Sequence, residues 1–290
     1  MHLVRAMRPR QWTKNVLVFA GLIFGQKLTD PASVELAITA FVVFCLLSSS
    51  VYLLNDVHDR AADRLHPAKA SRPIASGALG VGAALGAAAI LAGVSLGTAF
   101  WISRSFGAVA ASYLALMTGY TFWAKHVVIL DVLALAAGFV LRAAGGAAAV
   151  NVTFSHWLLL LTLLGALFLG LSKRRAEIVA LTDTAHSHRR SLAEYSPYLL
   201  DQMISVVTAS TLLAYAFYTI SPDTVQKFGT AQLIWTVPFP LYGIFRYLYL
   251  VHQREGGGNP SDTLLEDRPV LLCVALWAAS VVLILYGPWR

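Results

Sequence analysis

An acidic cluster at residues 55–64 has the composition of a metal-binding segment. It reads NDVHDRAADR and follows directly on an apolar stretch. If the helix of that stretch continues, Asn55, Asp59 and Asp63 recur every four residues, and Asp56 lies on the same face. Carboxylates so placed repel one another, which would destabilise an isolated helix. A divalent cation would offset the repulsion, and oxygen ligands of this kind suit Mg²⁺. The spacing therefore predicts a Mg²⁺ site.

A simpler interpretation of the acidic cluster stays open. The segment can be the solvated end of a helix, with Arg60 and Arg64 neutralising its carboxylates as salt bridges. Two further cations, Lys69 and Arg72, follow in the segment PAKASRP at residues 67–73. They suit the oxygens of a pyrophosphate group that Mg²⁺ only partly neutralises. They also fit the general excess of Lys and Arg in cytoplasmic loops.

A second charged segment, SKRRAE at residues 172–177, ends another apolar stretch. We call Lys173, Arg174 and Arg175 the basic cluster. Lys173 and Glu177 are four residues apart, so on a helix they face the same way. Tyr195 lies further on, among polar groups that could contact a hydroxylated ligand. The alternative is that these cations anchor a helix end at the membrane interface and that the tyrosine belongs to an aromatic belt.

Two charges fall within a single apolar stretch, Asp131 and Arg142. Ionisable residues inside a membrane are functional candidates, because facing lipid is costly for them. Their spacing is close to three helical turns, which puts both on nearly the same face but about 16 Å apart, too far to pair. Asp131 is nearer the cytoplasmic end and could join a polar site there.

The elements that must position these residues are membrane helices. The 290-residue chain is 57% hydrophobic and only 13% charged, with a mean hydropathy of +0.65. Its long runs are continuously apolar, which favours helices over a membrane barrel with alternating residues. The first run is the weakest, with a clean apolar core of only Val16 to Gly25. We predict an all-α, polytopic helical bundle of about nine transmembrane helices, forming one domain over residues 1–290. The nine ranges are 15–28, 33–54, 81–102, 105–123, 127–149, 154–172, 203–220, 231–251 and 269–287.

Charge sets the expected orientation. Most of the 22 Lys and Arg residues fall on one side if the amino terminus is inside, which makes that side cytoplasmic. The long loops 55–80, 173–202 and 252–268 then share the cytoplasmic face, where we expect the active site. The basic amino terminus is not followed by a small-x-small cleavage site, so we expect it to be retained. No nucleic-acid-binding motif accompanies the positive charge, and no cysteine pattern indicates zinc or a disulfide.

The acidic motif at the end of a second helix, in a nine-helix bundle, resembles the first aspartate motif of the UbiA-type prenyltransferase superfamily. The resemblance runs from Arg8-Pro9-x-Gln11-Trp12-x-Lys14-Asn15 to the ninth helix. It implies a membrane enzyme that uses Mg²⁺ and a diphosphate substrate. Most of that superfamily has a second Asp-rich motif after helix six, whereas this chain has the basic cluster there.

With a cationic second motif, the chain resembles the decaprenyl-phosphate phosphoribosyltransferase branch of the superfamily. That branch implies phosphoribosyl transfer from phosphoribosyl pyrophosphate to a polyprenyl phosphate lipid for cell-wall arabinan precursors, in a bacterial inner membrane. It leaves room for a homo-oligomer and implies no nucleic-acid partner. Two rivals remain: a prenyltransferase acting on an aromatic acceptor for a quinone or haem pathway, and a non-enzymatic lipid carrier or transporter, for which no clear repeat is visible.

The resemblance also implies roles for particular residues. Asn55, Asp56, Asp59 and Asp63 would hold Mg²⁺ and pyrophosphate. Glu177 and Tyr195 would contact the ribose. The expected phosphate ligands are Lys14, Lys69, Arg72, Lys173, Arg174 and Arg175. The expected catalytic residues are Asp56, Asp59, Asp63 and Lys173, and Asp131 and Arg142 join the substrate-binding set.

Overall fold

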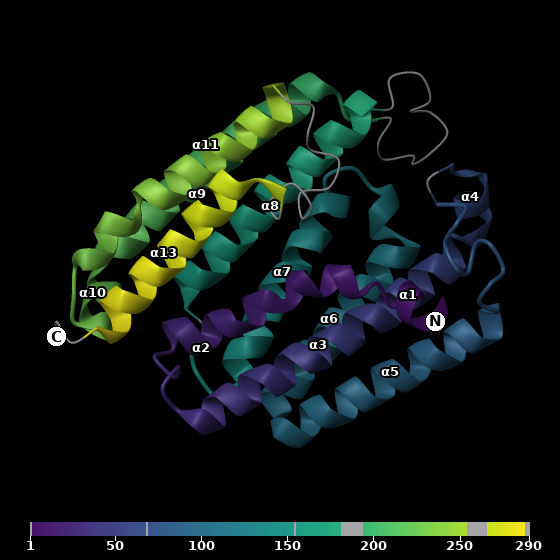
Figure 1. The fold of residues 1–290 in the computed structure, drawn as a ribbon, viewed down its shortest axis with the longest axis horizontal. Coiled ribbons are helices and arrows are strands. Elements are labelled where there is room, and N and C mark those ends of the chain that lie inside the picture. Colours follow the sequence, from purple (N-terminus) through teal and green to yellow (C-terminus); the bar gives the residue numbers. More distant parts are fainter. Residues whose placement is uncertain (1, 68, 154, 181–193, 254–265, 288–290) are drawn as a thin grey trace. The chain divides into compact units, whose positions relative to one another are not determined.

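The computed structural model describes residues 2–67, 69–153, 155–180, 194–253 and 266–287. The described residues form helices and no strands, which confirms the all-α prediction. The chain divides into two compact units, Met1–Phe154 and Ser155–Arg290 (Figure 1). Much of the loops predicted at 173–202 and 252–268 lies outside the described residues.

The first unit carries the acidic cluster. Its elements in order are α1 (His2–Ala6), the 3-10 helix η1 (Pro9–Phe19), α2 (Ala20–Phe24), α3 (Pro31–His58), α4 (Arg60–Leu65), α5 (Val81–Ile102), α6 (Arg104–Phe122), the short 3-10 helix η2 (Ala124–His126) and α7 (Leu130–Ala149).

The core of this unit lies between α3 and α6. Buried residues recur on α3 at alternating steps of three and four, which is the period of one helix face: Ala37, Ala40, Phe44, Leu47 and Val51. The matching face of α6 carries Phe106, Ala110, Tyr113 and Met117. The Phe44 and Tyr113 rings meet edge to face, with centroids 5.4 Å apart. This packing fixes the direction in which α3 leaves the core and presents its charged end. α5 runs alongside α3 in the same unit (Figure 1).

Small residues let η1 and α2 approach the backbone of α7. A Cβ added to Gly21 would lie 2.6 Å from the Cα of Ala147, and one added to Gly146 would collide with the carbonyl group of Val18. Only glycine leaves room for such a close approach of two backbones. An 11-residue 3-10 helix is unusually long, since runs beyond three or four residues are uncommon. Packing of the segment against α3 and α7 therefore helps to hold this conformation.

The second unit carries the basic cluster. Its elements are α8 (His156–Ala180), α9 (Pro197–Ile220), α10 (Pro222–Phe228), the 3-10 helix η5 (Gln232–Thr236), α11 (Pro238–Gln253) and α13 (Arg268–Tyr286). α8 packs on α9, and α11 packs on α13. A buried hydrogen bond of 2.6 Å joins the Tyr215 hydroxyl to Thr236, and the Trp277 indole donates to the same hydroxyl at 2.8 Å. This network links α9, η5 and α13.

Six described helices are long and apolar enough to cross a membrane. They are Pro31–His58, Val81–Ile102, Leu130–Ala149, His156–Val179, Pro197–Ile220 and Arg268–Tyr286. Each coincides with a predicted span. The other three predicted spans differ. Residues 15–28 form parts of η1 and α2, residues 231–251 are broken into η5 and α11, and α6 has the length but not the apolarity. For these three, crossing the membrane stays a prediction.

Candidate functional site

The acidic cluster lies where α3 passes into α4. The Asp59 N–H donates to the Asn55 carbonyl at 2.9 Å, and the Asp63 N–H donates to the Asp59 carbonyl at 2.8 Å. These two bonds of helical spacing span the junction of α3 and α4, but the single helix on which all four side chains would share one face is interrupted at Asp59. α3 itself ends at His58. Asn55 lies half-buried one residue before Asp56.

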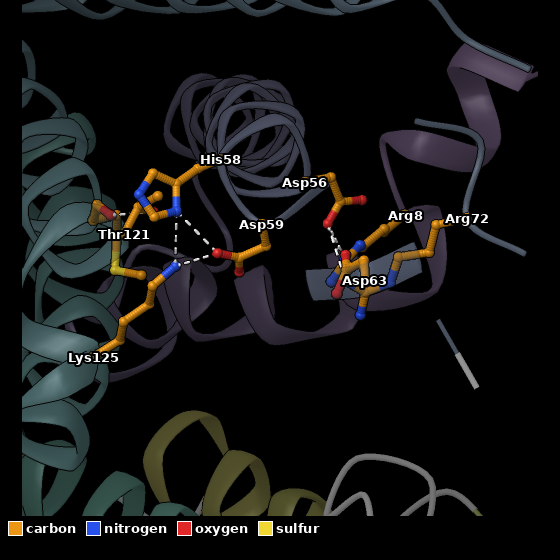
Figure 2. A network of polar contacts seen from close by, with 9 residues as sticks. Arg8, Asp56, His58, Asp59, Asp63, Arg72, Thr121 and Lys125 are labelled. Carbon is orange, nitrogen blue, oxygen red and sulfur yellow. Dashed lines mark hydrogen bonds and ion pairs between the residues drawn. The ribbon is translucent and has the colours of Figure 1, made fainter. Parts of the chain in front are cut away.

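Two buried carboxylates of the cluster share one guanidinium group. Arg72 Nη1 lies 2.6 Å from Asp63 Oδ2 and 3.2 Å from Asp56 Oδ1. Arg8 Nη2 lies 2.5 Å from the same Asp56 oxygen. The side chains of Asp56 and Asp63 are only 3% and 5% exposed, whereas those of Arg8 and Arg72 are 28% and 27% exposed. The carboxylates are therefore inner groups and the arginines outer groups of this ion-pair network (Figure 2).

Distant parts of the chain bring the two arginines here. Arg8 has a left-handed backbone, with φ of 55°, directly before η1. Ser49 Oγ donates a hydrogen bond to the neighbouring Met7 carbonyl at 3.0 Å. The Trp12 indole in turn donates to Ser49 Oγ at 3.1 Å. These contacts fasten the amino-terminal segment to α3. Arg72 stands in a run of turns, where its N–H donates to the Lys69 carbonyl at 2.9 Å.

The third carboxylate has separate partners. Lys125 Nζ, from η2, donates to Asp59 Oδ1 at 2.6 Å, and His58 Nδ1 lies 2.9 Å from the same oxygen (Figure 2). Burial favours the neutral acid, but hydrogen bonds from Lys125 and His58 outweigh it and lower the pKa of Asp59. Here the exposure is reversed, because the Lys125 side chain is 3% exposed and the Asp59 side chain 23%. Asp59 is therefore an outer group held by an inner cation.

The structure corrects the interpretation in which Arg60 and Arg64 neutralise the acidic cluster. Arg64 Nε donates instead to the Ala75 carbonyl at 2.8 Å, and no described ion pair involves Arg60. The neutralising cations are Arg8, Arg72 and Lys125. A helix places side chains three and four residues apart together, but these three cations come from other segments. The sequence therefore could not identify them by local spacing.

The acidic cluster fits a divalent cation by its donor chemistry. Oxygens of Asp56 and Asp63 converge on a single position, which the Arg72 nitrogen holds. A guanidinium nitrogen at that point stands in for a cation, and carboxylate oxygens are the ligands that Mg²⁺ takes. Among the described residues, however, no group of three or more His, Cys, Asp or Glu side chains is arranged around one metal position. The cluster therefore needs a shift of its arginines before several carboxylates can share one ion.

The basic cluster of the second unit is paired largely within α8. Arg174 Nη1 lies 2.6 Å from Glu177 Oε2, and Lys173 Nζ lies 3.8 Å from Glu177 Oε1. The predicted common face of Lys173 and Glu177 is thus present. Arg175 reaches α9, where its Nε donates to Asp201 Oδ1 at 2.5 Å. Lys173 remains 41% exposed, whereas Arg174 is 3% exposed. Tyr195 is buried, two residues before α9.

Arg142 has partners that the sequence did not reveal. Its Nε donates to Asn15 Oδ1 at 2.7 Å and its Nη2 to the Tyr113 hydroxyl at 2.7 Å. The guanidinium group also lies over the Tyr113 ring, 4.7 Å from the centroid. Arg142 therefore ties η1 to α6 and α7. Asp131 is fully buried in the first turn of α7, and Lys14 and Lys69 are half-buried. The substrate-binding roles of these residues stay predictions.

Sequence reasoning missed Arg8, His58 and Lys125 as members of the cluster. Arg8 lies in the amino-terminal motif, but nothing in that motif indicates a carboxylate partner. Lys125 lies between the predicted spans 105–123 and 127–149, where nothing in the sequence indicates a carboxylate partner. Backbone strain marks both places once the structure is known. Arg8 has a positive φ, and so does Ile129, at 68°, just after the segment that carries Lys125. A β-branched residue rarely adopts this conformation.

Comparison with known proteins gives consistent matches over nearly the whole chain. Residues 15–261 match the UbiA prenyltransferase family. Decaprenyl-phosphate phosphoribosyltransferase from Corynebacterium glutamicum is 36% identical, over 98% of this chain and 86% of that protein. The protein of the same name from Mycolicibacterium smegmatis is 33% identical, over 98% and 92%. A solved UbiA homolog from Archaeoglobus fulgidus, bound to DMAPP and Mg²⁺, has a TM-score of 0.77 at 18% identity and covers 98% of this chain and 99% of that one. At that identity the likeness concerns the fold.

Proposed function

The chain belongs to the UbiA prenyltransferase family, and on this premise we propose that it transfers a phosphoribosyl group from phosphoribosyl pyrophosphate to decaprenyl phosphate or a similar polyprenyl phosphate. The relatives from C. glutamicum and M. smegmatis carry that activity in their names. The observation in this chain that carries the proposal is the basic cluster at the end of α8, where a second acidic motif would serve a prenyl diphosphate. A donor with a separate 5-phosphate needs fixed cations in addition to those that hold its pyrophosphate.

In the proposed reaction, a phosphate oxygen of the lipid attacks C1 of the ribose, and pyrophosphate leaves with the electrons of the broken C1–O bond. A phosphate monoester is already anionic near neutral pH, so the enzyme needs no strong general base. Catalysis then rests on positioning and on stabilising the charge of the leaving group.

The acidic cluster is assigned to the pyrophosphate. Bound Mg²⁺ would neutralise the pyrophosphate charge, and Asn55, Asp56, Asp59 and Asp63 are the oxygen donors that would hold the ion. Arg72 stands beside two of these carboxylates and can donate to pyrophosphate oxygens. The buried Lys125 keeps the Asp59 carboxylate in place from its inner side.

The basic cluster is assigned to the 5-phosphate and the ribose. Lys173 is the most exposed cation of the basic cluster, and its ion pair with Glu177 is long, at 3.8 Å. It is therefore the cation best able to turn toward a ligand. Arg174 and Glu177 hold each other closely. Glu177 and Tyr195 are the proposed ribose contacts.

The chain is a multi-pass membrane protein, as its six apolar helices and its family membership indicate. We propose the bacterial inner membrane as its location, with both clusters on the cytoplasmic side, where the bias of Lys and Arg puts their loops. Phosphoribosyl pyrophosphate is water-soluble, so a cytoplasmic site fits its supply. The acceptor would lie with its chain in the membrane and its phosphate at the mouth of the site.

The test is to incubate the purified protein in detergent with Mg²⁺, decaprenyl phosphate and phosphoribosyl pyrophosphate labelled in the ribose. Label should pass into the organic phase, and Asp59→Asn should reduce that transfer. The main rival is a prenyltransferase for an aromatic acceptor. Turnover of a prenyl diphosphate with such an acceptor, together with no labelled lipid, would contradict the proposed donor.

A further inference from the structure

The two halves of the acidic cluster, one with Asp56 and Asp63 and the other with Asp59, differ in whether the cation or the carboxylate lies nearer to solvent. At Asp56 and Asp63, the carboxylates are buried and the guanidinium groups of Arg8 and Arg72 lie outside them. At Asp59, the carboxylate is the more exposed partner, and the buried Lys125 lies behind it. A ligand that approaches from solvent therefore meets two cations at one half, and the Asp59 carboxylate together with the 35%-exposed His58 at the other. The two halves are drawn in Figure 2.

Arg72 holds the position on which two metal-donor carboxylates converge. Its Nη1 contacts Asp56 Oδ1 and Asp63 Oδ2, so a divalent cation can bind this pair of oxygens at that position only if the nitrogen leaves. A cation and a guanidinium group cannot share that position, because both are positive and need the same oxygens. A metal at this position and the Arg72 ion pairs therefore compete for the same two oxygens.

An anion can remove Arg72 where a metal alone cannot. Pyrophosphate oxygens are good acceptors for a guanidinium group. Arg72 is 27% exposed and lies within a run of turns, so its side chain has room to turn outward. When Arg72 donates to pyrophosphate instead, the two carboxylates lose their cation and gain the capacity to bind a metal. Both binding events are then favourable together and unfavourable alone.

We propose that Arg72 is an internal counter-cation that closes the Asp56–Asp63 position to metal until pyrophosphate draws it away, so that metal and donor bind interdependently. The proposal rests on the proposed function only in taking pyrophosphate as the ligand of the acidic cluster. Arg8, which pairs with Asp56 but not with Asp63 among the described ion pairs, has the same role with a smaller effect.

The proposal gives one substitution two opposite effects. In Arg72→Gln, Mn²⁺ used as a probe without pyrophosphate should bind more tightly, by about tenfold, because coupling of this kind usually falls between 5- and 150-fold. Inorganic pyrophosphate without metal, in the presence of a chelator, should bind more weakly by about the same factor. Arg8→Gln should change both affinities in the same directions by less.

The measurements are Mn²⁺ binding by electron paramagnetic resonance and equilibrium dialysis of radiolabelled pyrophosphate, both on the full chain in detergent. Arg64→Gln is the matched control, because it removes the same charge from α4 while its Nε serves only the Ala75 carbonyl. It should change neither affinity by more than about twofold. Thermal unfolding of each variant checks that the protein remains folded.

A loss of both affinities in Arg72→Gln, or no change in Mn²⁺ binding, would overturn the proposal, since a merely structural arginine would weaken both or neither. If Arg72→Gln does not fold, the Arg8→Gln affinities decide by the same criterion. Neither measurement uses the ribose or the lipid. A failure of phosphoribosyl transfer therefore remains distinguishable from a failure of the counter-cation proposal.

Discussion

In the acidic cluster the carboxylates are paired with cations from other segments of the chain, whereas the basic cluster is paired mainly within its own helix. Arg8 is 48 residues from Asp56, and Lys125 is 66 residues from Asp59. Arg174, in contrast, is three residues from its partner Glu177. The first cluster is therefore set by the packing of one whole unit, and the second mainly by the register of α8. We expect the carboxylates of the first cluster to be intolerant of substitution, and the second cluster to adapt to its ligand.

The largest effect is expected when a buried carboxylate of the acidic cluster is lost. Asp56→Asn leaves Arg8 and Arg72 without a shared anion and removes a proposed metal donor. Phosphoribosyl transfer should fall by about 100- to 1,000-fold, the usual loss for a main electrostatic contact of a transition state. Initial rates with labelled donor would measure it. Asp223→Asn makes the same change at an exposed position in α10, and this control variant should retain full activity. Comparable rates in the two variants would mean that the cluster is structural.

A smaller loss is expected at the inner cation. Lys125→Met keeps the length of the side chain but removes the charge that holds Asp59. In this variant Asp59 keeps only its weaker contacts. The KM for the magnesium complex of phosphoribosyl pyrophosphate should therefore rise by about tenfold to a hundredfold. Steady-state kinetics at varied donor would show it. Lys27→Met, an exposed lysine outside both clusters, is the control. A fall in kcat with KM unchanged would assign Lys125 to the reacting atoms instead.

The basic cluster should respond more weakly and in a different parameter. Lys173→Gln removes an exposed cation whose bond to Glu177 is long. We expect the KM for phosphoribosyl pyrophosphate to rise by about tenfold with kcat little changed, which is the pattern for a contact equally strong in the ground and transition states. Binding of inorganic pyrophosphate should not change. Equal weakening of pyrophosphate binding would place Lys173 at the leaving group and contradict the division of roles.

The interior arginine should affect stability rather than transfer. Arg142→Met keeps much of the buried volume but leaves Asn15 and the Tyr113 hydroxyl without their donor. The expected cost is about 1–3 kcal/mol of folding free energy, read as a lower unfolding temperature in detergent. Transfer rates at low temperature should remain within about threefold of the unchanged protein. A selective rise in the KM for the lipid acceptor, with normal thermal stability, would show that Arg142 binds substrate.

The amino-acid sequence determined the helices and the position of the acidic motif. Hydropathy identified all six long apolar helices, and one of them, residues 81–102, with its exact bounds. Hydropathy failed where an apolar segment is not an α-helix, as in η1. Apolar composition does not distinguish an α-helix from a 3-10 helix held by its neighbours. The short apolar core from Val16 to Gly25 was the only signal of that weakness.

The spacing of the acidic motif would put its side chains on one face only if one helix ran through it, but α3 ends at His58 and α4 begins at Arg60. What only the tertiary structure decided is which cation meets which carboxylate, and which of the two lies outermost. Local periodicity brings together residues three and four positions apart. The choice of Arg8, Arg72 and Lys125 over the adjacent Arg60 and Arg64 depends instead on how η1, the turns after α4 and the η2 segment pack around the end of α3.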